Sequence, residues 1–194
     1  RVLAWDLYNE VGNFFLPLLA LPAPIKQFRL LIRGLSHYLL PIPTLTLFRV
    51  AARWARSADP EQPVTSPLWF KSPALNRALM EESDVVSFHH YRDAADLERY
   101  IRELSAYGRP LLCTEYLART TGSLFRTARP VFGAADIPCF NWGLVAGKTQ
   151  TQFTWTDRPG AGAEGSPWYH DILRPDGSPY DEGEAALLRA YLGS

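Results

Sequence analysis

Residues 84–115 read DVVSFHHYRDAADLERYIRELSAYGRPLLCTE, and their pattern is that of a strand, a helix and a second strand. The first strand is expected over 84–91, where β-branched and aromatic side chains are frequent. A helix is expected over 94–106, because apolar residues recur at i, i+4 and i+7: Leu97, Ile101 and Leu104. Gly108 ends this helix, and the apolar segment 110–115 forms the next strand. This order predicts a parallel βαβ unit.

The same alternation continues on both sides of this unit. Further strands are expected over 2–10, 62–66 (ending near Trp69) and 138–145. Further helices are expected over 46–57 and from Asp181 to Tyr191, the latter opened by a capping box of Asp181 and Glu184. Strands that alternate with helices in this way are typical of a parallel α/β sheet or barrel.

The composition limits the range of partners. The 194 residues include 20 basic and 20 acidic side chains, so the formal net charge is zero. A neutral chain gives no electrostatic reason to expect nucleic acid or an anionic membrane as partner. With 47% hydrophobic residues, the chain can bury the core of a single domain over 1–194. The apolar stretches 14–25 and 30–48 are interrupted by prolines or charges, so no transmembrane helix is expected.

Each expected strand ends in a polar or aromatic cluster. In a barrel of parallel strands all carboxyl ends open on one face, so Glu10 and Glu115 could converge there. Strand alternation predicts that Cys113 shares the inward face of Glu115 and that Cys139 faces the helices. Both cysteines are therefore expected to be free thiols, and their spacing predicts no metal site. Two carboxylates flanked by tryptophans suit cleavage of a glycosidic bond.

The segment Trp5–Glu10 (WDLYNE) resembles the Asn-Glu acid/base strand of clan A glycoside hydrolases, especially the cellulase-like family five enzymes. Three later segments match that family's order of motifs: His89-x-Tyr91, Glu115 in LLCTE and Trp142 in FNWG. The resemblance implies a (β/α)8 TIM barrel of which this chain holds strands four to eight. A full barrel takes about 250 residues, so the N-terminal strands are expected outside this sequence and are a possible partner.

The resemblance also implies roles for individual residues. Glu10 would be the general acid/base and Glu115 the nucleophile of a retaining enzyme, while Asn9 would bind the sugar 2-hydroxyl. His89 and Tyr91 would orient the carboxylates. Aromatic sugar contacts are expected from Trp142, Trp69, Trp155 and Trp168, although Trp155 and Trp168 could equally anchor a loop. The implied substrate is a β-linked glucan, mannan or xylan, which suits an extracellular or periplasmic location, and no metal or cofactor is needed.

Two departures from the family pattern concern the first half of the chain. Val11 replaces the usual proline after Asn-Glu, and an apolar insertion spans 14–45. Within it, 30–39 has helical spacing with Arg33 among the apolar residues. This segment could cover the barrel, associate with a second copy or lie on a membrane surface.

Several residues have simpler interpretations. Asp6 is expected to be a buried partner of a cation, and Trp54 to pack on the sheet from its helix. His90 is expected to face away from the site or to stabilise its loop. His37 and His170 are expected to be loop or surface histidines.

Two other functions stay open at this level. The chain could be a non-catalytic carbohydrate-binding or interaction module made of an incomplete barrel. It could also be a transglycosylase, which uses the same residues as a hydrolase and differs only in what attacks the intermediate. Exchanging Glu115 for Gln separates an enzyme from a binding module.

Overall fold

The computed structural model describes residues 2–13, 41–69, 72–155 and 167–192. The chain divides into two compact units, Arg1–Ser87 and Phe88–Ser194. The helical pattern predicted over 30–39, most of the 14–45 insertion and His37 lie outside the described residues. Among the residues that are described, no helix is long and apolar enough to span a bilayer.

In residues 2–13, 41–69 and 72–87, which the structure describes, the first unit has two short parallel strands and two helices. Their bounds are β1 Trp5–Asp6, α2 Pro41–Ser57, β2 Val64–Thr65 and α3 Pro73–Glu82. In the parallel β1–β2 pair, Trp5 lies opposite Val64 and Asp6 opposite Thr65. Segment 64–68 is also bonded to segment 84–87, because Asp84 N–H donates to Val64 O at 2.8 Å and Leu68 N–H to Ser87 O at 2.9 Å.

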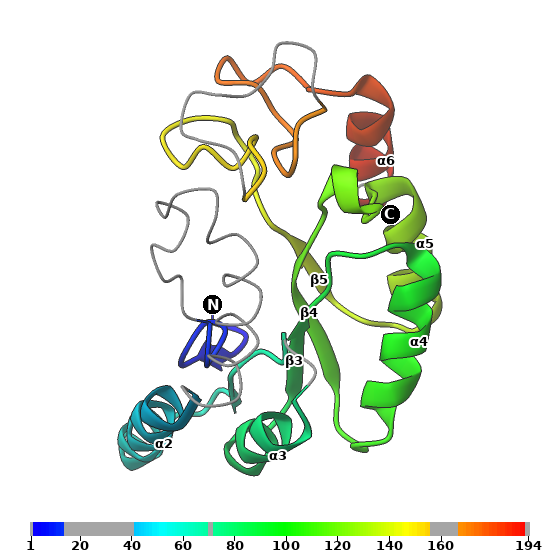
Figure 1. Ribbon diagram of the computed structural model, residues 1–194. Helices are drawn as coiled ribbons and strands as arrows, with labels where there is room; N and C mark the ends of the chain where they lie inside the picture. Colours follow the sequence, from blue (N-terminus) through cyan, green and yellow to red (C-terminus); the bar gives the residue numbers. More distant parts are fainter. Residues whose placement is uncertain (1, 14–40, 70–71, 156–166, 193–194) are drawn as a thin grey trace, which may run out of the picture. The chain divides into compact units, whose positions relative to one another are not determined.

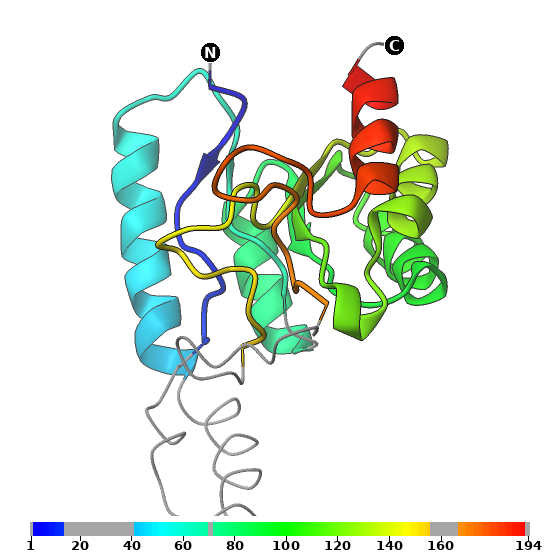
Figure 2. The same cartoon turned by 90° about the horizontal axis from the view of Figure 1, so that it is seen from above.

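Helix α2 packs on α3 and lies beside β1 (Figure 2). It begins at Pro41 instead of 46, since proline is tolerated in a first helical turn. Phe48 and Ala52, one turn apart, are its buried residues. At its end, Arg56 donates to both carboxylate oxygens of Asp84 at 2.8 Å, while the same carboxylate accepts from Val64 N–H at 2.8 Å. Asp84 therefore joins α2 to β2.

The second unit is a three-stranded sheet in the order β3-β4-β5, with α4 and α5 on one side and α6 beside α5 (Figure 1). Its elements are β3 Val86–His89, of which Phe88 and His89 belong to this unit, α4 Ala94–Ser105, β4 Leu111–Tyr116, the 3-10 turn Arg119–Thr121, α5 Phe125–Ala134, β5 Cys139–Asn141 and α6 Glu182–Leu192. Strands β4 and β5 are parallel. The alternation of strands and helices with parallel pairing confirms the α/β class predicted from the sequence.

Helix α4 has the buried face that its spacing predicts. Its buried side chains are Leu97, Tyr100, Ile101 and Leu104. The Asp93 carboxylate caps the first turn by accepting from Asp96 N–H at 2.9 Å. The sequence patterns did not single out helices α3 and α5. Each connects two successive strands: α3 lies between β2 and β3 in the chain, and α5 lies between β4 and β5.

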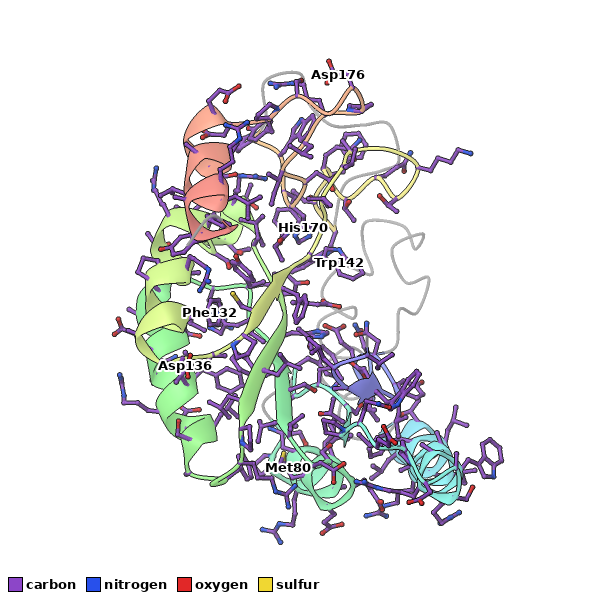
Figure 3. The ribbon with its side chains drawn as sticks, turned by 180° about the vertical axis from the view of Figure 1, so that it is seen from behind. Met80, Phe132, Asp136, Trp142, His170 and Asp176 are labelled. Carbon is purple, nitrogen blue, oxygen red and sulfur yellow. The ribbon has the colours of Figure 1, made fainter. Side chains whose placement is uncertain are left out.

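Phe132 is the residue whose truncation should cost the most in the core of the second unit. It is fully buried, points from α5 toward the sheet (Figure 3), and its ring lies 5.1 Å from that of Tyr116. Because Phe132→Ala leaves a large cavity, we expect it to lower the free energy of unfolding by about 3–5 kcal/mol in urea titrations. The control Trp54→Ala, at a side chain that is 69% exposed, should change it by less than about 0.5 kcal/mol.

Three expectations about the first unit are wrong. Trp54 is exposed instead of packing on the sheet, because it lies two residues, about 200° around the helix, from the buried Ala52. Asp6 is exposed instead of buried, since it belongs to a strand of a two-stranded sheet. The strand expected over 2–10 ends at Asp6, and Glu10 lies in a turn with a left-handed φ of 50°, followed by Gly12 at 85°.

Candidate active site

Glu115 lies near the carboxyl end of β4 and is buried, at 8% exposure. Its Oε2 accepts a hydrogen bond from the Tyr91 hydroxyl at 2.5 Å and lies 3.2 Å from His89 Nδ1. The structure thus brings together three of the residues predicted to form a site. The hydrogen bond that the Tyr91 hydroxyl donates to this oxygen favours the charged form of the carboxyl group. His89 and Glu115 also offer atoms that could ligate a metal ion.

The backbone of β4 departs from strict alternation near Glu115. Its pairing with β5 shifts register between Cys113 and Tyr116. The prediction that the side chains of Cys113 and Glu115 share one face of the sheet assumed that side chains alternate regularly along β4. The register shift interrupts this alternation. Cys139 contacts the Tyr116 hydroxyl by a hydrogen bond, and Tyr116 packs on Phe132 of α5, so Cys139 lies on the helix side as predicted. Both thiols are free, which confirms that prediction.

Tyr91 is held by contacts to its backbone and to its ring. Thr121 Oγ1 donates to Tyr91 O. The Tyr91 ring meets Trp155 edge-on at 5.0 Å and His170 at 5.5 Å between centroids. Trp155 also contacts Tyr169 at 4.8 Å and remains 47% exposed. The side chain that bonds Glu115 is therefore part of an aromatic cluster with one exposed member.

His170 is buried, and its prediction as a loop or surface histidine is wrong with respect to burial. It is 1% exposed, and its Nδ1 lies 2.5 Å from Leu117 O. Because a carbonyl only accepts, Nδ1 carries the proton. Burial lowers the pKa of His170 to about 4. Gly143, at φ +80°, allows His170 to lie close to the backbone that follows β5, since a Cβ at position 143 would lie 2.9 Å from His170 Cβ.

The buried His170 gives a signed pH dependence of stability. An unfolded histidine takes up its proton near pH 6.5 and the folded one near 4, so between these values the unfolded state binds more protons. The free energy of unfolding should therefore fall on acidification from about pH 6.5 to pH 4, by at most about 3 kcal/mol. Urea titrations between about pH 7 and pH 4.5 would show it. A His170→Asn chain with the same pH dependence as the parent would contradict this.

His90 points away from Glu115. Its Nε2 lies 3.1 Å from Asp96 Oδ2, and its ring lies 6.0 Å from Tyr100, both on α4. Its backbone N–H donates to Glu115 O at 2.9 Å. The histidine thus links the loop after β3 to the first turn of α4.

The two remaining tryptophans of the second unit differ in their surroundings. Trp142 follows β5, is 41% exposed, and its backbone N–H donates to Tyr116 O at 2.9 Å. Trp168 stacks on Tyr180 with centroids 4.7 Å apart, and Arg174 lies 5.9 Å from both rings. One face of Trp168 is thus covered by its own loop, whereas Trp142 retains a large exposed area.

Arg119 is a structural residue that the sequence patterns did not indicate. It forms a partly buried ion pair with Glu184 at 2.5 Å, and it donates to Trp168 O at 3.1 Å and to Asp171 O at 3.0 Å. Glu184 N–H is capped by Asp181 at 2.9 Å, but the Glu184 carboxylate binds Arg119 instead of closing the predicted capping box. The loop after β5 is thereby fixed to the segment after Glu115.

The first unit contains the other predicted site residues. Glu10 is half-buried in the turn after β1, and its carboxylate accepts from Asn13 Nδ2. Trp69 donates from its indole N–H to Val11 O at 2.9 Å, next to Glu10 in the chain. Asn9 is exposed. Trp69 and Glu10 are therefore linked through the backbone of one turn.

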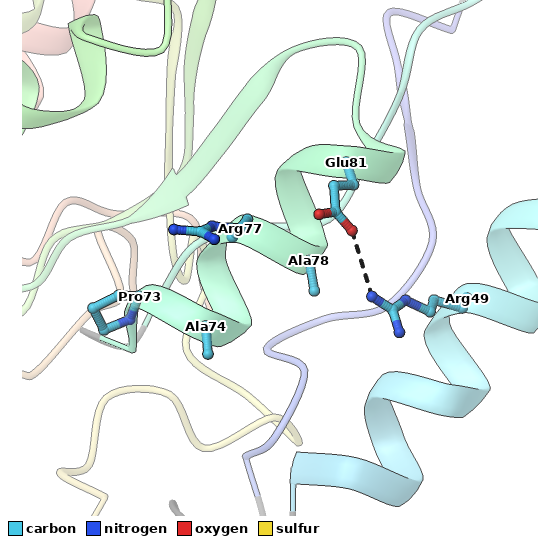
Figure 4. Close-up of a pocket in the computed structure, with 6 residues that line it drawn as sticks. All are labelled: Arg49, Pro73, Ala74, Arg77, Ala78 and Glu81. Atoms are coloured by element: carbon cyan, nitrogen blue, oxygen red, sulfur yellow. Dashed lines mark hydrogen bonds and ion pairs between the residues drawn. The ribbon is translucent and has the colours of Figure 1, made fainter.

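A hollow of about 430 Å³ lies over α2 and α3 of the first unit (Figure 4). Its lining consists of Arg49, Pro73, Ala74, Arg77, Ala78 and Glu81. Arg49 and Glu81 pair across it at 3.4 Å. None of the residues predicted to act on a sugar lines this hollow.

No protein-family model and no curated protein matches the chain. Solved structures similar to it include a β-glucuronidase of Bacteroides uniformis, with a TM-score of 0.49 and 15% identity over 71% of this chain and 19% of that chain. Another is Bacteroides uniformis β-glucuronidase 2 covalently bound to cyclophellitol-6-carboxylate aziridine, with a TM-score of 0.48 and 13% identity over 72% and 19%. The chain spans about a fifth of the length of either structure, and this degree of likeness assigns it to no family.

Proposed function

We propose that the chain belongs to a retaining β-glycoside hydrolase in which Glu115 is the nucleophile and Glu10 the general acid/base. The observation that carries this proposal is the environment of Glu115. A buried carboxylate near the end of a parallel strand, with Tyr91 and His89 at one of its oxygens, is oriented and stabilised as an anion. Such a carboxylate suits attack on an anomeric carbon.

In the first step of this reaction, a Glu115 oxygen forms a bond to the anomeric carbon while the bond to the leaving oxygen breaks. The Glu10 carboxylic acid donates its proton to that oxygen. In the second step, the Glu10 carboxylate takes a proton from water, the water oxygen bonds to the anomeric carbon, and the Glu115 carboxylate is released. Tyr91 and His89 orient Glu115 through both steps.

The proposal extends to the barrel that the sequence predicts. Glu10 and Glu115 each follow or end a strand of a parallel pair, and the strands alternate with helices along the chain. We propose that these strands are strands four to eight of a (β/α)8 barrel, whose carboxyl ends share one face. The two carboxyl groups would then lie about 5–5.5 Å apart, as double displacement requires.

The proposed substrate is a β-linked glucan, mannan or xylan. Trp142 and Trp155 are 41% and 47% exposed, so their rings can stack on the apolar face of a sugar. Asn9, which is exposed beside Glu10, would bind the 2-hydroxyl. Trp69 and Trp168 would add further aromatic contacts beside these groups.

Trapping of the covalent intermediate tests this function. The protein is incubated with activated 2-fluoro glycosides of glucose, mannose, xylose and glucuronic acid, and its intact mass is measured. A retaining enzyme acquires the mass of one fluorosugar, and peptide mapping should locate it on Glu115. If no sugar of the panel adds mass to a chain that circular dichroism shows to be folded, the proposed function fails.

A second candidate is a non-catalytic carbohydrate-binding module. The observation that favours it is the exposure of Trp142 and Trp155, since aromatic platforms bind sugars without any chemistry. Such a module would bind oligosaccharides, acquire no covalent fluorosugar, and lose affinity on Trp155→Ala. A transglycosylase would acquire the adduct and release it faster to a sugar acceptor than to water.

A further inference from the structure

The ring of His170 links the segments that follow all three strands of the second unit. It contacts Tyr91, which follows β3, with centroids 5.5 Å apart. It is bonded to the carbonyl of Leu117, which follows β4, at 2.5 Å. Its Cβ approaches Gly143, which follows β5, so closely that a side chain there would meet it at 2.9 Å. His170 is thus a buried side chain that packs against Tyr91, the residue that donates a hydrogen bond to Glu115.

We propose that His170 is a positioning residue that holds the Tyr91 hydroxyl against Glu115. This inference rests on the proposed role of Glu115 as the nucleophile, because only then does the Tyr91 bond influence a reaction. His170 itself touches neither Glu115 nor, on this proposal, the sugar. It acts through the orientation of the Tyr91 ring.

The contacts of Tyr91 explain why it depends on support from His170. Thr121 donates to the Tyr91 carbonyl, and this bond to the backbone does not itself orient the ring. The rings of Trp155, at an interplanar angle of 80°, and of His170, at 63°, pack against the Tyr91 ring. Trp155 is 47% exposed, whereas His170 is 1% exposed and tethered at Nδ1. The more rigid of the two supports is therefore His170.

Histidine combines two properties that this position needs. Its Nδ1–H provides a tether to Leu117 O, which a phenylalanine could not provide. Its burial favours the neutral ring, so that it adds no charge beside the Tyr91–Glu115 hydrogen bond. Nε2 is buried and has no hydrogen-bond partner among the residues that the structure describes, so the tether is the polar contact that orients the ring.

The test measures the pKa of the Glu115 carboxyl by carbon-13 NMR of labelled side chains, with Glu115→Gln assigning the signal. Tyr91→Phe removes a hydrogen bond to the carboxylate and should raise this pKa by about one unit. His170→Asn, which keeps an amide donor for Leu117 O but lacks the ring, should raise it in the same direction. In the double variant the rise should not exceed that of Tyr91→Phe alone, because both changes remove the same interaction.

The matched control is His90→Asn, which changes another buried histidine of this unit whose ring faces Asp96 and Tyr100. It should leave the Glu115 pKa unchanged. If His170→Asn leaves that pKa unchanged while Tyr91→Phe raises it, the inference is overturned. The same holds if the two shifts add in the double variant. Should His170→Asn fail to fold, His170→Phe carries the test, since it keeps the ring volume and loses the tether.

These measurements need no turnover, so they are separable from the proposed function. If the pKa shifts occur but no fluorosugar adduct forms, the hydrolase proposal fails and the coupling of His170 to Glu115 stands. If an adduct forms on Glu115 and the shifts are absent, the enzyme stands and the positioning role fails. In an active enzyme, His170→Asn should lower the adduct-formation rate about five- to tenfold, and only in chains that retain the Tyr91 hydroxyl.

Discussion

Glu115→Gln should abolish turnover of aryl β-glycosides, with a loss in kcat of about 10⁴-fold or more. The amide keeps the shape of the carboxylate, and its carbonyl oxygen can still accept from the Tyr91 hydroxyl. It cannot form the glycosyl ester, however, because a neutral amide oxygen is a poor nucleophile. Spectrophotometric release of nitrophenol from a panel of nitrophenyl β-glycosides measures the rate, and calorimetry with the matching oligosaccharide measures binding.

The matched control for this variant is Glu98→Gln, which makes the same chemical change at an exposed position of α4 in the same unit. It should retain full turnover. Glu115→Gln should keep sugar affinity within about threefold, since the aromatic platforms are untouched. Turnover within tenfold of the parent would contradict the role of Glu115. A parent chain that binds sugar but shows no turnover would identify a binding module.

Glu10→Ala should lower kcat by about 10²- to 10⁴-fold, to an extent that depends on the leaving group. A dinitrophenolate needs no protonation, so with that aglycone the first step should remain fast while the second step, which needs a base, becomes slow. The result is a burst of one equivalent of dinitrophenol. With an unactivated disaccharide both steps slow down, and hardly any product forms.

Added azide distinguishes loss of the acid/base from general damage. The small anion can enter the space left by the Glu10 side chain and attack the glycosyl ester without a base, giving a β-glycosyl azide and restoring turnover. Glu61→Ala, at an exposed glutamate of the same unit, should show neither the burst nor any effect of azide. Equal losses with activated and unactivated substrates, and no azide product, would contradict the assignment of Glu10.

Local sequence signals predict much of the second unit. The spacing of Leu97, Ile101 and Leu104 predicts α4, because residues one helical turn apart lie on the same face of a helix. The contact of Glu115 with His89 and Tyr91 also follows from the sequence, since neighbouring strands bring their ends together. These predictions depend on short-range rules.

What the sequence does not predict depends on contacts between distant residues. His170 lies in a long loop that resembles a surface segment, and its burial results from a carbonyl at position 117 and a glycine at position 143. The half-buried Arg119 pairs with Glu184, which lies 65 residues away in the chain. Neither partner can be identified from spacing alone. Close to Glu10, the turn begins earlier than the apolar pattern suggests because the backbone there is left-handed.

The central claim is that Glu10 and Glu115 act as a pair on one glycosidic bond. A crystal structure of the protein with an unhydrolysed oligosaccharide or a fluorosugar measures this directly, as the distance between the two carboxyl groups. Double displacement predicts about 5–5.5 Å, with the anomeric carbon against Glu115 and the leaving oxygen within reach of Glu10. A separation well beyond about 6.5 Å, or a sugar bound away from both carboxylates, would contradict the account.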